Sequence, residues 1–174
     1  MIELVARLRN VSVLQAARDI ARHFAVDLDQ DRGGDDEVIA SPIGLLRSRH
    51  EAVQSLGIRP ETAKAFWAGY CAEGKCFMIP IFDDRGACIS HVAVMDGGYH
   101  TYPDGFDGRG LFFNAHRIFP ANHLYVTYSP LMVLKAHQEG IVNAVAVFGA
   151  YDAERLIALA NFVRRKRVER VEFF

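Results

Sequence analysis

Residues 124–149, LYVTYSPLMVLKAHQEGIVNAVAVFG, constrain the fold of this chain more than any other stretch. A short apolar, β-branched run precedes Ser129, a favoured N-cap residue, and Pro130 suits the first position of a helix. Gly140 suits the position just after a helix, and the apolar run from Val142 to Val147 is typical of a strand buried between helices. The stretch therefore predicts strand, helix and strand, and a right-handed crossover makes the two strands parallel neighbours.

A second helix and a third strand are expected to follow this unit. Asp152 is a good N-cap, and the apolar spacing predicts a helix that reaches Val163 or beyond. The side chains predicted on its buried side are Leu156, Leu159, Ala160 and Val163. Residues 168–174 predict the third strand, whose two terminal phenylalanines would form an exposed apolar edge unless a partner or a second copy covers them.

Upstream, the sequence changes from helical to β patterning. Residues 42–56 predict a helical segment, Pro60 opens another helix, and an antiparallel meander of strands is expected at residues 76–82, 87–95 and 99–102. The expected fold class is α/β. Its three regions are an N-terminal helical hairpin with an acidic linker at 1–40, a small α+β region at 41–115, and an incomplete parallel sheet with flanking helices at 116–174.

The composition is that of a globular protein without an overall basic field. The chain has 174 residues, 51% of them hydrophobic, and a formal net charge of -1, so nucleic-acid contacts would have to come from a local patch. Its three cysteines follow no disulfide spacing, and no signal peptide or membrane-spanning run is visible. These features predict a cytoplasmic protein with no membrane partner.

The ordered series of segments resembles the catalytic core of bacterial DNA primases, which includes a Toprim domain. LGIRPETAKAFWAGY, MIPIFDDRGACISHVAV and TYPDGFDGRGLFFN are similar to the primase core, and IELVARLRNVSVLQAARDIARHF is similar to the end of the zinc-ribbon domain that precedes it. In this resemblance the metal-binding part of the ribbon would lie before Met1, and the Asp-x-Asp pair of Toprim would lie beyond Phe174. The chain thus resembles a truncated, degenerate primase core.

The same resemblance implies that the catalytic acids have been replaced. Toprim catalysis uses clustered carboxylates to hold Mg²⁺, which neutralises phosphate charge. Tyr128 stands at the position of the catalytic Glu, Ser129 at that of the following Gly, and Met132 at that of the helical Asp. A phenol and a thioether are poor Mg²⁺ ligands, so no catalytic residue, metal or cofactor is expected. As scaffold, these residues predict a strand end, an N-cap and a core-facing helical methionine.

A basic run near the end of the chain supplies the predicted nucleic-acid-binding residues, which are Arg164, Arg165, Lys166, Arg167 and Arg170. Such a run also complements a helix dipole as an ordinary solvated feature, and phosphate contacts would distinguish themselves by a steep salt dependence. The resembled family also holds nucleic acid through basic residues near its central hairpin. Phe82 and Val94 stand at the corresponding places here.

Three other constellations have simpler structural interpretations. Acids occupy the first three ligand positions of a calcium loop, at Asp27, Asp29 and Asp31, but Arg32 and Val38 replace the required Gly and Glu. The glycine-rich loop at 102–110 lacks the phosphate-loop Lys and predicts turns. A zinc site can be drawn from Cys71, Cys76, Cys88 and His91, but a Cys-x4-Cys spacing is not that of a zinc knuckle.

These observations favour an inactive primase-like protein over an enzyme. It would serve as a nucleic-acid-binding or partner-binding module in DNA replication or mobile-element biology. Single-stranded DNA or RNA is the predicted ligand, and a protein partner or a homodimer would form through the terminal strand. One alternative is part of a split primase or nucleotidyl transferase, in which another chain supplies the zinc ribbon and the acids that bind Mg²⁺. A further alternative is a pure protein-interaction subunit.

Overall fold

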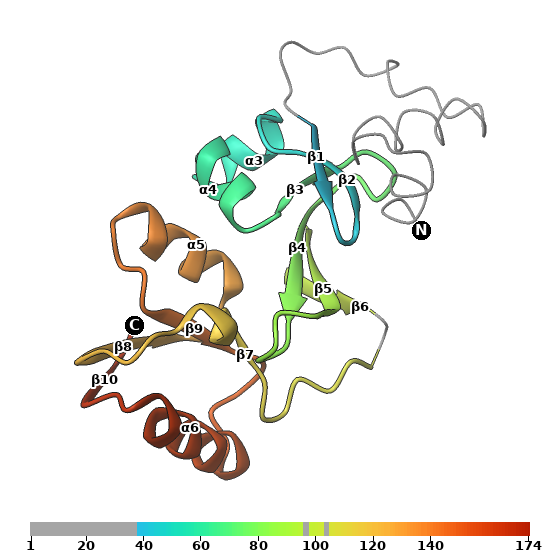
Figure 1. Cartoon of the computed structure of the whole chain (residues 1–174). Coiled ribbons are helices and arrows are strands. Elements are labelled where there is room, and N and C mark those ends of the chain that lie inside the picture. Colours follow the sequence, from blue (N-terminus) through green and yellow to red (C-terminus); the bar gives the residue numbers. More distant parts are fainter. Residues whose placement is uncertain (1–37, 96–97, 103–104) are drawn as a thin grey trace, which may run out of the picture.

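The computed structural model describes residues 38–95, 98–102 and 105–174 (Figure 1). The helical hairpin predicted at the N-terminus, most of the acidic linker and the calcium alternative fall within residues 1–37 and lie outside the described part.

The first sheet is an antiparallel meander whose six strands follow one another in chain order (Figure 1). They are β1 (Val38–Ser41), β2 (Gly44–Arg47), β3 (Gly69–Cys71), β4 (Cys76–Phe82), β5 (Cys88–Met95) and β6 (Gly98–Tyr102). The central β4–β5 pair runs in register from Phe77 opposite Val94, with a bulge between Ile81 and Phe82. The predicted meander is confirmed.

The helix predicted over residues 42–56 is wrong in its first half. Residues 38–47 form a β-hairpin in which Ile39 pairs with Leu46, and helix α3 spans only Glu51–Ser55. Gly44 has a φ of 132°, which no helix accommodates. Leu46 is fully buried because Gly69 on β3 leaves room for it, since a Cβ at Gly69 would lie 2.9 Å from the Leu46 Cβ.

A second short helix, α4 (Pro60–Ala65), follows α3, and Pro60 stands at its beginning as predicted. Phe66 caps the helix and is buried, whereas Trp67 adopts a left-handed conformation and is 45% exposed. The helix therefore ends before both aromatic residues.

The second sheet has the strand order β10–β8–β9–β7 (Figure 1). The strands are β7 (Phe112–Phe113), β8 (His123–Thr127), β9 (Ala144–Val147) and β10 (Arg170–Phe173). The last three are parallel, and β7 is antiparallel to β9. The predicted βαβ unit and third strand are confirmed. A 3₁₀ turn, η1 (Ala115–Arg117), connects β7 to β8.

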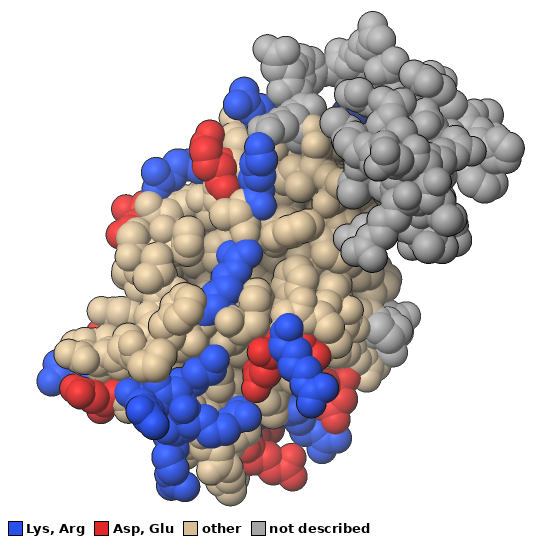
Figure 2. Space-filling model, in the orientation of Figure 1, with Lys and Arg blue, Asp and Glu red and all other residues tan. Residues whose placement is uncertain are grey.

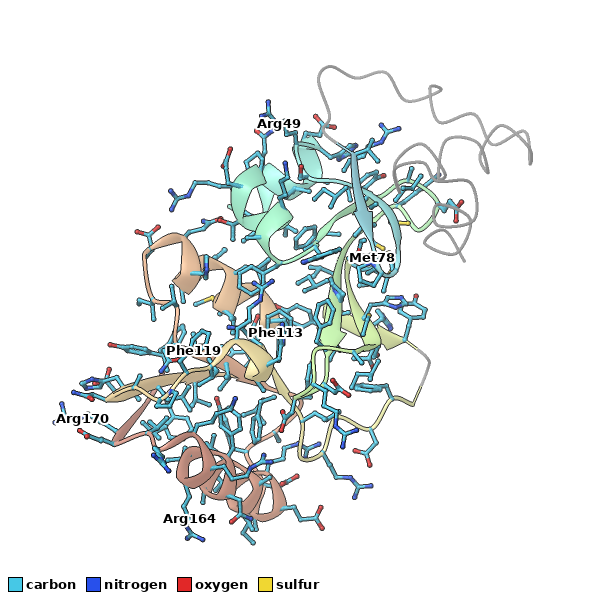
Figure 3. All side chains as sticks on the ribbon, viewed as in Figure 1. Arg49, Met78, Phe113, Phe119, Arg164 and Arg170 are labelled. Atoms are coloured by element: carbon cyan, nitrogen blue, oxygen red, sulfur yellow. The ribbon has the colours of Figure 1, made fainter. Side chains whose placement is uncertain are left out.

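Two helices cover opposite faces of this parallel sheet (Figure 1). Helix α5 (Pro130–Gln138) packs Val133 and Leu134 into a core shared with Phe77 and Ile79 of the first sheet. Phe113, labelled in Figure 3, belongs to the same core and lies 6.0 Å from Phe66 between ring centroids. The two sheets are therefore joined by one continuous apolar cluster.

Helix α6 (Ala153–Lys166) covers the other face, where Leu159 and Phe162 are its most buried residues. Asp152 caps it by accepting a hydrogen bond from the Arg155 backbone N–H at 2.8 Å, as predicted. The predicted buried side is partly wrong, because Leu156 is 44% exposed and Ala160 is exposed. Among the described residues, no helix combines the length and apolar character needed to cross a membrane.

Candidate functional site at the carboxyl edge of the parallel sheet

The carboxyl ends of β8, β9 and β10 meet at one edge of the second sheet, because these strands are parallel. Ligands of open α/β sheets bind outside this edge. We call it the carboxyl edge. The residues delivered there are Tyr128 and Ser129 after β8, Phe148 and Gly149 after β9, and Phe174 after β10.

Ser129 connects the two sheets at this edge. Its side chain is buried, accepts a hydrogen bond from the Met132 N–H at 3.4 Å, and forms a second hydrogen bond with the hydroxyl of Tyr99 on β6. The predicted N-cap is confirmed. Met132 is 37% exposed, so the expected core-facing methionine is wrong. The reason is that Met132 lies in the first turn of α5, where the buried face consists of Pro130, Val133 and later residues.

Tyr128 is 65% exposed, and two aromatic contacts involve the residues at the end of β10. Tyr151 meets Phe173 edge to face with ring centroids 5.4 Å apart, and Phe174 meets Tyr125 in the same way at 6.2 Å. Burial, helped by the neighbouring phenol of Tyr128, raises the pKa of Tyr151. The carboxyl edge is thus lined by neutral aromatic side chains.

A pocket of about 300 Å³ opens beside Tyr128, between the first sheet and the carboxyl edge. Its aromatic walls are Tyr99, Phe106, Tyr128 and Phe148. The remaining lining residues are Val92, Thr101, Asp107, Gly108, Pro130, Gly149 and Arg155. The pocket therefore draws on β5 and β6, on the Phe106–Gly108 part of the glycine-rich loop, on the residues that follow β8 and β9, and on α6.

Charged groups beside the pocket are paired. Arg109 binds Asp107 at 2.7 Å and lies 3.7 Å from Glu154. Arg155 donates to the Phe148 carbonyl at 2.6 Å and also binds Asp152. The hydrogen bonds from Arg109 lower the pKa of Asp107 to about 2, so this carboxylate stays ionised at neutral pH.

The donor atoms at the carboxyl edge do not fit Mg²⁺. The strand ends present a phenol, a capping hydroxyl and two phenyl rings, whereas Mg²⁺ needs oxygen ligands that include carboxylates. Among residues 38–95, 98–102 and 105–174, no group of three or more His, Cys, Asp or Glu side chains is placed to hold a metal ion. We derive no metal-dependent step for this edge.

The basic run predicted from the sequence lies at the other end of the parallel strands. Arg170 begins β10 and is paired in register with His123, the first residue of β8. In Figure 3, Arg164 and Arg170 are labelled at the ends of α6 and β10 that lie away from the first sheet. Figure 2 shows Lys and Arg side chains gathered over this part of the molecule.

Several of these basic side chains also have structural contacts. The Lys166 Nζ donates to the Ile118 carbonyl at 3.1 Å, and Arg165 lies 3.5 Å from Asp84. Arg167 ends α6 in the left-handed conformation, with a φ of 54°. Arg164 is exposed.

The zinc alternative is not assembled. Cys71 and Cys76 face each other across β3 and β4, whereas Cys88 is paired with Phe82 at the opposite end of β4. His91 instead stacks on Tyr102, with ring centroids 4.8 Å apart. Burial raises the pKa of both Cys76 and Cys88, which favours neutral thiols.

Most residues of the pocket could not be recognised as site residues from the sequence. Tyr99, Phe106, Asp107, Phe148 and Arg155 all line it, yet none was a candidate site residue. The glycine-rich loop offered the one available signal. Gly108 lies so close to the end of β9 that a Cβ there would be 2.6 Å from the Phe148 Cβ, and this close approach positions the segment around Gly108.

Solved structures identify the fold, although no protein-family model and no curated protein matches the chain. The structure of the Aquifex aeolicus primase, with its zinc-binding and RNA polymerase domains, matches with a TM-score of 0.60 at 20% identity, over 99% of this chain and 56% of that chain. The chain has the fold of a primase catalytic core.

Two further structures support this fold. A DnaG primase catalytic domain bound to ssDNA has a TM-score of 0.58 at 18% identity and covers 72% of this chain and 55% of that chain. The primase fragment of the bacteriophage T7 primase-helicase protein has a TM-score of 0.52 at 17% identity, over 70% of this chain and 52% of that chain. The chain spans about half the length of these primase structures.

Proposed function

We propose that this chain is a catalytically inactive, primase-like module that binds single-stranded nucleic acid without a metal ion, in DNA replication or in mobile-element biology. The observation that carries the proposal is the chemistry of the carboxyl edge. Aromatic rings and a capping serine stand where Mg²⁺-dependent phosphoryl transfer requires clustered carboxylates. The carboxyl edge has the parallel strand ends of the βαβ unit, but these ends carry no clustered carboxylates for that reaction.

The ligand class is suggested by the neighbours and by the basic run. One structure of the same fold is described as bound to ssDNA, and another as a complex with a double-stranded DNA oligomer that has a 6-nucleotide overhang. Between Arg164 and Glu172 this chain carries five Lys or Arg residues and two Glu. Such a local excess of positive charge attracts a phosphate backbone even though the whole chain is nearly neutral.

Salt dependence tests the proposal directly. The affinity for a labelled single-stranded oligonucleotide, measured by fluorescence anisotropy, should fall steeply between about 50 and 200 mM salt. Each phosphate contact contributes about 0.7 to the slope of log affinity against log salt concentration. Changing Arg164→Gln together with Arg167→Asn should therefore reduce that slope by about 1.4. An affinity insensitive to salt, or no binding at low salt, would contradict nucleic-acid binding.

Lys75→Asn is the matched control. Lys75 and Arg167 both have a positive φ, 47° and 54°, and Asn tolerates this conformation well. The two Asn substitutions therefore place the same residue in the same backbone region. Lys75 lies in the β3–β4 turn, away from the basic run, so its replacement should leave the salt slope unchanged.

Catalytic inactivity has its own test. We expect no primer synthesis or nucleotidyl transfer by the purified chain with Mg²⁺ or Mn²⁺. Metal-dependent product formation that disappears on Tyr128→Phe would contradict inactivity. Product formation only after addition of a second polypeptide that carries the missing acids would instead support the split-enzyme alternative.

A further inference from the structure

The pocket beside Tyr128 is an aromatic-walled cleft of about 300 Å³ with one carboxylate and one guanidinium in its lining. We propose that it holds one unstacked base of the bound single strand, with a preference for guanine and cytosine. The proposal rests on the proposed function and deepens it, because it assigns a base-binding site separate from the basic run.

The walls suit a flat ring. Tyr99 and Tyr128 come from different sheets, and Phe106 meets Phe148 edge to face with ring centroids 6.1 Å apart. Aromatic faces stack on nucleobases regardless of sequence, which is how proteins hold single strands. Since Tyr128 is 65% exposed, its ring is accessible to a base that enters from solvent.

The walls are also held in place. The hydrogen bond between Tyr99 and Ser129 fixes the first sheet to the carboxyl edge. The close approach of Gly108 to Phe148 fixes the segment around Gly108. Because these contacts join three segments of the fold without a ligand, the pocket is preorganised, which limits the entropy lost on binding.

The polar groups indicate which bases fit. Asp107 is an ionised acceptor, and the amino groups of guanine and cytosine are donors. Arg155 uses Nε and Nη1 for the Phe148 carbonyl and for Asp152, while its Nη2 lies beside Gly149, where a Cβ would be 3.1 Å away. No described residue accepts a hydrogen bond from Nη2. A base carbonyl can therefore accept a hydrogen bond from Nη2. Thymine and uracil have no amino group that could donate to Asp107.

Local charge favours a base over a phosphate in this pocket. Two guanidinium groups, those of Arg109 and Arg155, face the three carboxylates of Asp107, Asp152 and Glu154. This arrangement has no excess of positive charge to attract a phosphate. The basic run at the opposite edge of the sheet is better suited to bind the phosphates of the same strand.

Oligothymidylates of equal length that differ only at the central position provide the test. The wild-type chain should bind a central guanine or cytosine about five- to a hundredfold more tightly than an abasic site, the range expected for one stacked base. Central thymine should gain less, because the carboxylate of Asp107 then has no amino donor. Tyr128→Ala should abolish the preference, whereas Tyr128→Phe, which keeps the ring, should retain it.

Asp107→Asn separates hydrogen bonding from stacking. It should leave the preference over the abasic site and reduce the preference of guanine and cytosine over thymine. Tyr128 and Asp107 are both exposed, so their substitutions should leave the circular dichroism spectrum and the thermal midpoint unchanged. Salt-dependent binding with no base preference would overturn the pocket assignment and leave the proposed function standing. Failure of every oligonucleotide to bind would overturn both the pocket assignment and the proposed function. This is also the result expected if the carboxyl edge binds only protein.

Discussion

The hydrogen bond between Tyr99 and Ser129 ties the two sheets together at the pocket, and a double-mutant cycle can isolate its contribution to stability. Ser129→Ala removes this bond together with the N-cap bond to the Met132 N–H. Loss of the cap costs about 1 kcal/mol, and loss of a neutral hydrogen bond costs about another 1 kcal/mol. We expect Ser129→Ala to lower the free energy of unfolding by about 2 kcal/mol.

Tyr99→Phe removes only the bond between the sheets. Because Tyr99 is 43% exposed and Ser129 is buried, the phenol can turn to water when its partner is lost, whereas the serine hydroxyl cannot. The single change should cost about 1 kcal/mol, and the double mutant should cost about as much as Ser129→Ala alone. The coupling free energy is then about 1 kcal/mol.

Urea unfolding followed by circular dichroism measures these differences for the wild type, both single mutants and the double mutant. Ser55→Ala is a suitable control, because the Ser55 hydroxyl donates to a backbone carbonyl in an exposed position. Additive effects of the two substitutions, with a coupling energy near zero, would refute the conclusion that this bond joins the sheets.

Two further predictions concern the core and pH. Phe162→Ala should lower the free energy of unfolding by about 3–5 kcal/mol, because Phe162 is fully buried against Phe112. Ile157→Ala, on the exposed side of α6, should lower it by less than about 0.5 kcal/mol. Equal unfolding midpoints of the two variants in urea would contradict the packing of α6. Burial lowers the pKa of His91, His116 and His137 below the unfolded value of 6.5. The unfolded chain therefore binds more protons than the folded chain, and the free energy of unfolding should fall as pH drops below about 6.5. The free energy of unfolding measured between pH 4.5 and 7 should therefore rise with pH, and His116→Gln should flatten the slope; a flat wild-type profile would show that burial does not favour the neutral rings.

The βαβ unit could be predicted because its signals are local. Ser129 accepts the cap hydrogen bond and Gly140 has a φ of 84°, so each residue type meets a requirement of its own backbone position. The strands were also recognisable from apolar runs bounded by turns. Such signals need no knowledge of what packs across the chain.

The hairpin at residues 38–47 and the buried side of α6 could not be predicted in the same way. Leu46 has the spacing of a helical core residue, and only the space left by Gly69 on another strand makes it a sheet residue. Leu156 is in the expected helical register, but the residues of α6 that pack into the core are Leu159 and Phe162, with Ala158 and Val163 beside them. These outcomes depend on partners distant in sequence.

The pocket could not be predicted for a related reason, because its residues come from β5, β6, the glycine-rich loop, the ends of β8 and β9, and α6. The resemblance to primases singled out Tyr128, but only as the residue at the position of the catalytic Glu. Its neighbours Tyr99 and Asp107 become informative when the first sheet brings them to the carboxyl edge. An ionised aspartate and a tyrosine are ordinary surface residues until that contact is known.

The two proposed contact regions lie too far apart to serve the same nucleotide. Arg170 pairs with His123 at the start of β8, and the pocket residue Tyr128 follows the last residue of this 5-residue strand, so the two regions are separated by about 16 Å at a rise of about 3.3 Å per residue. A stacked strand advances about 3.4 Å per nucleotide, so about five nucleotides would connect the pocket to the basic run. At this separation, substitutions at Tyr128 and Arg164 should act independently. Loss of the ring should then change base preference without changing the salt slope, whereas loss of the arginine should do the reverse.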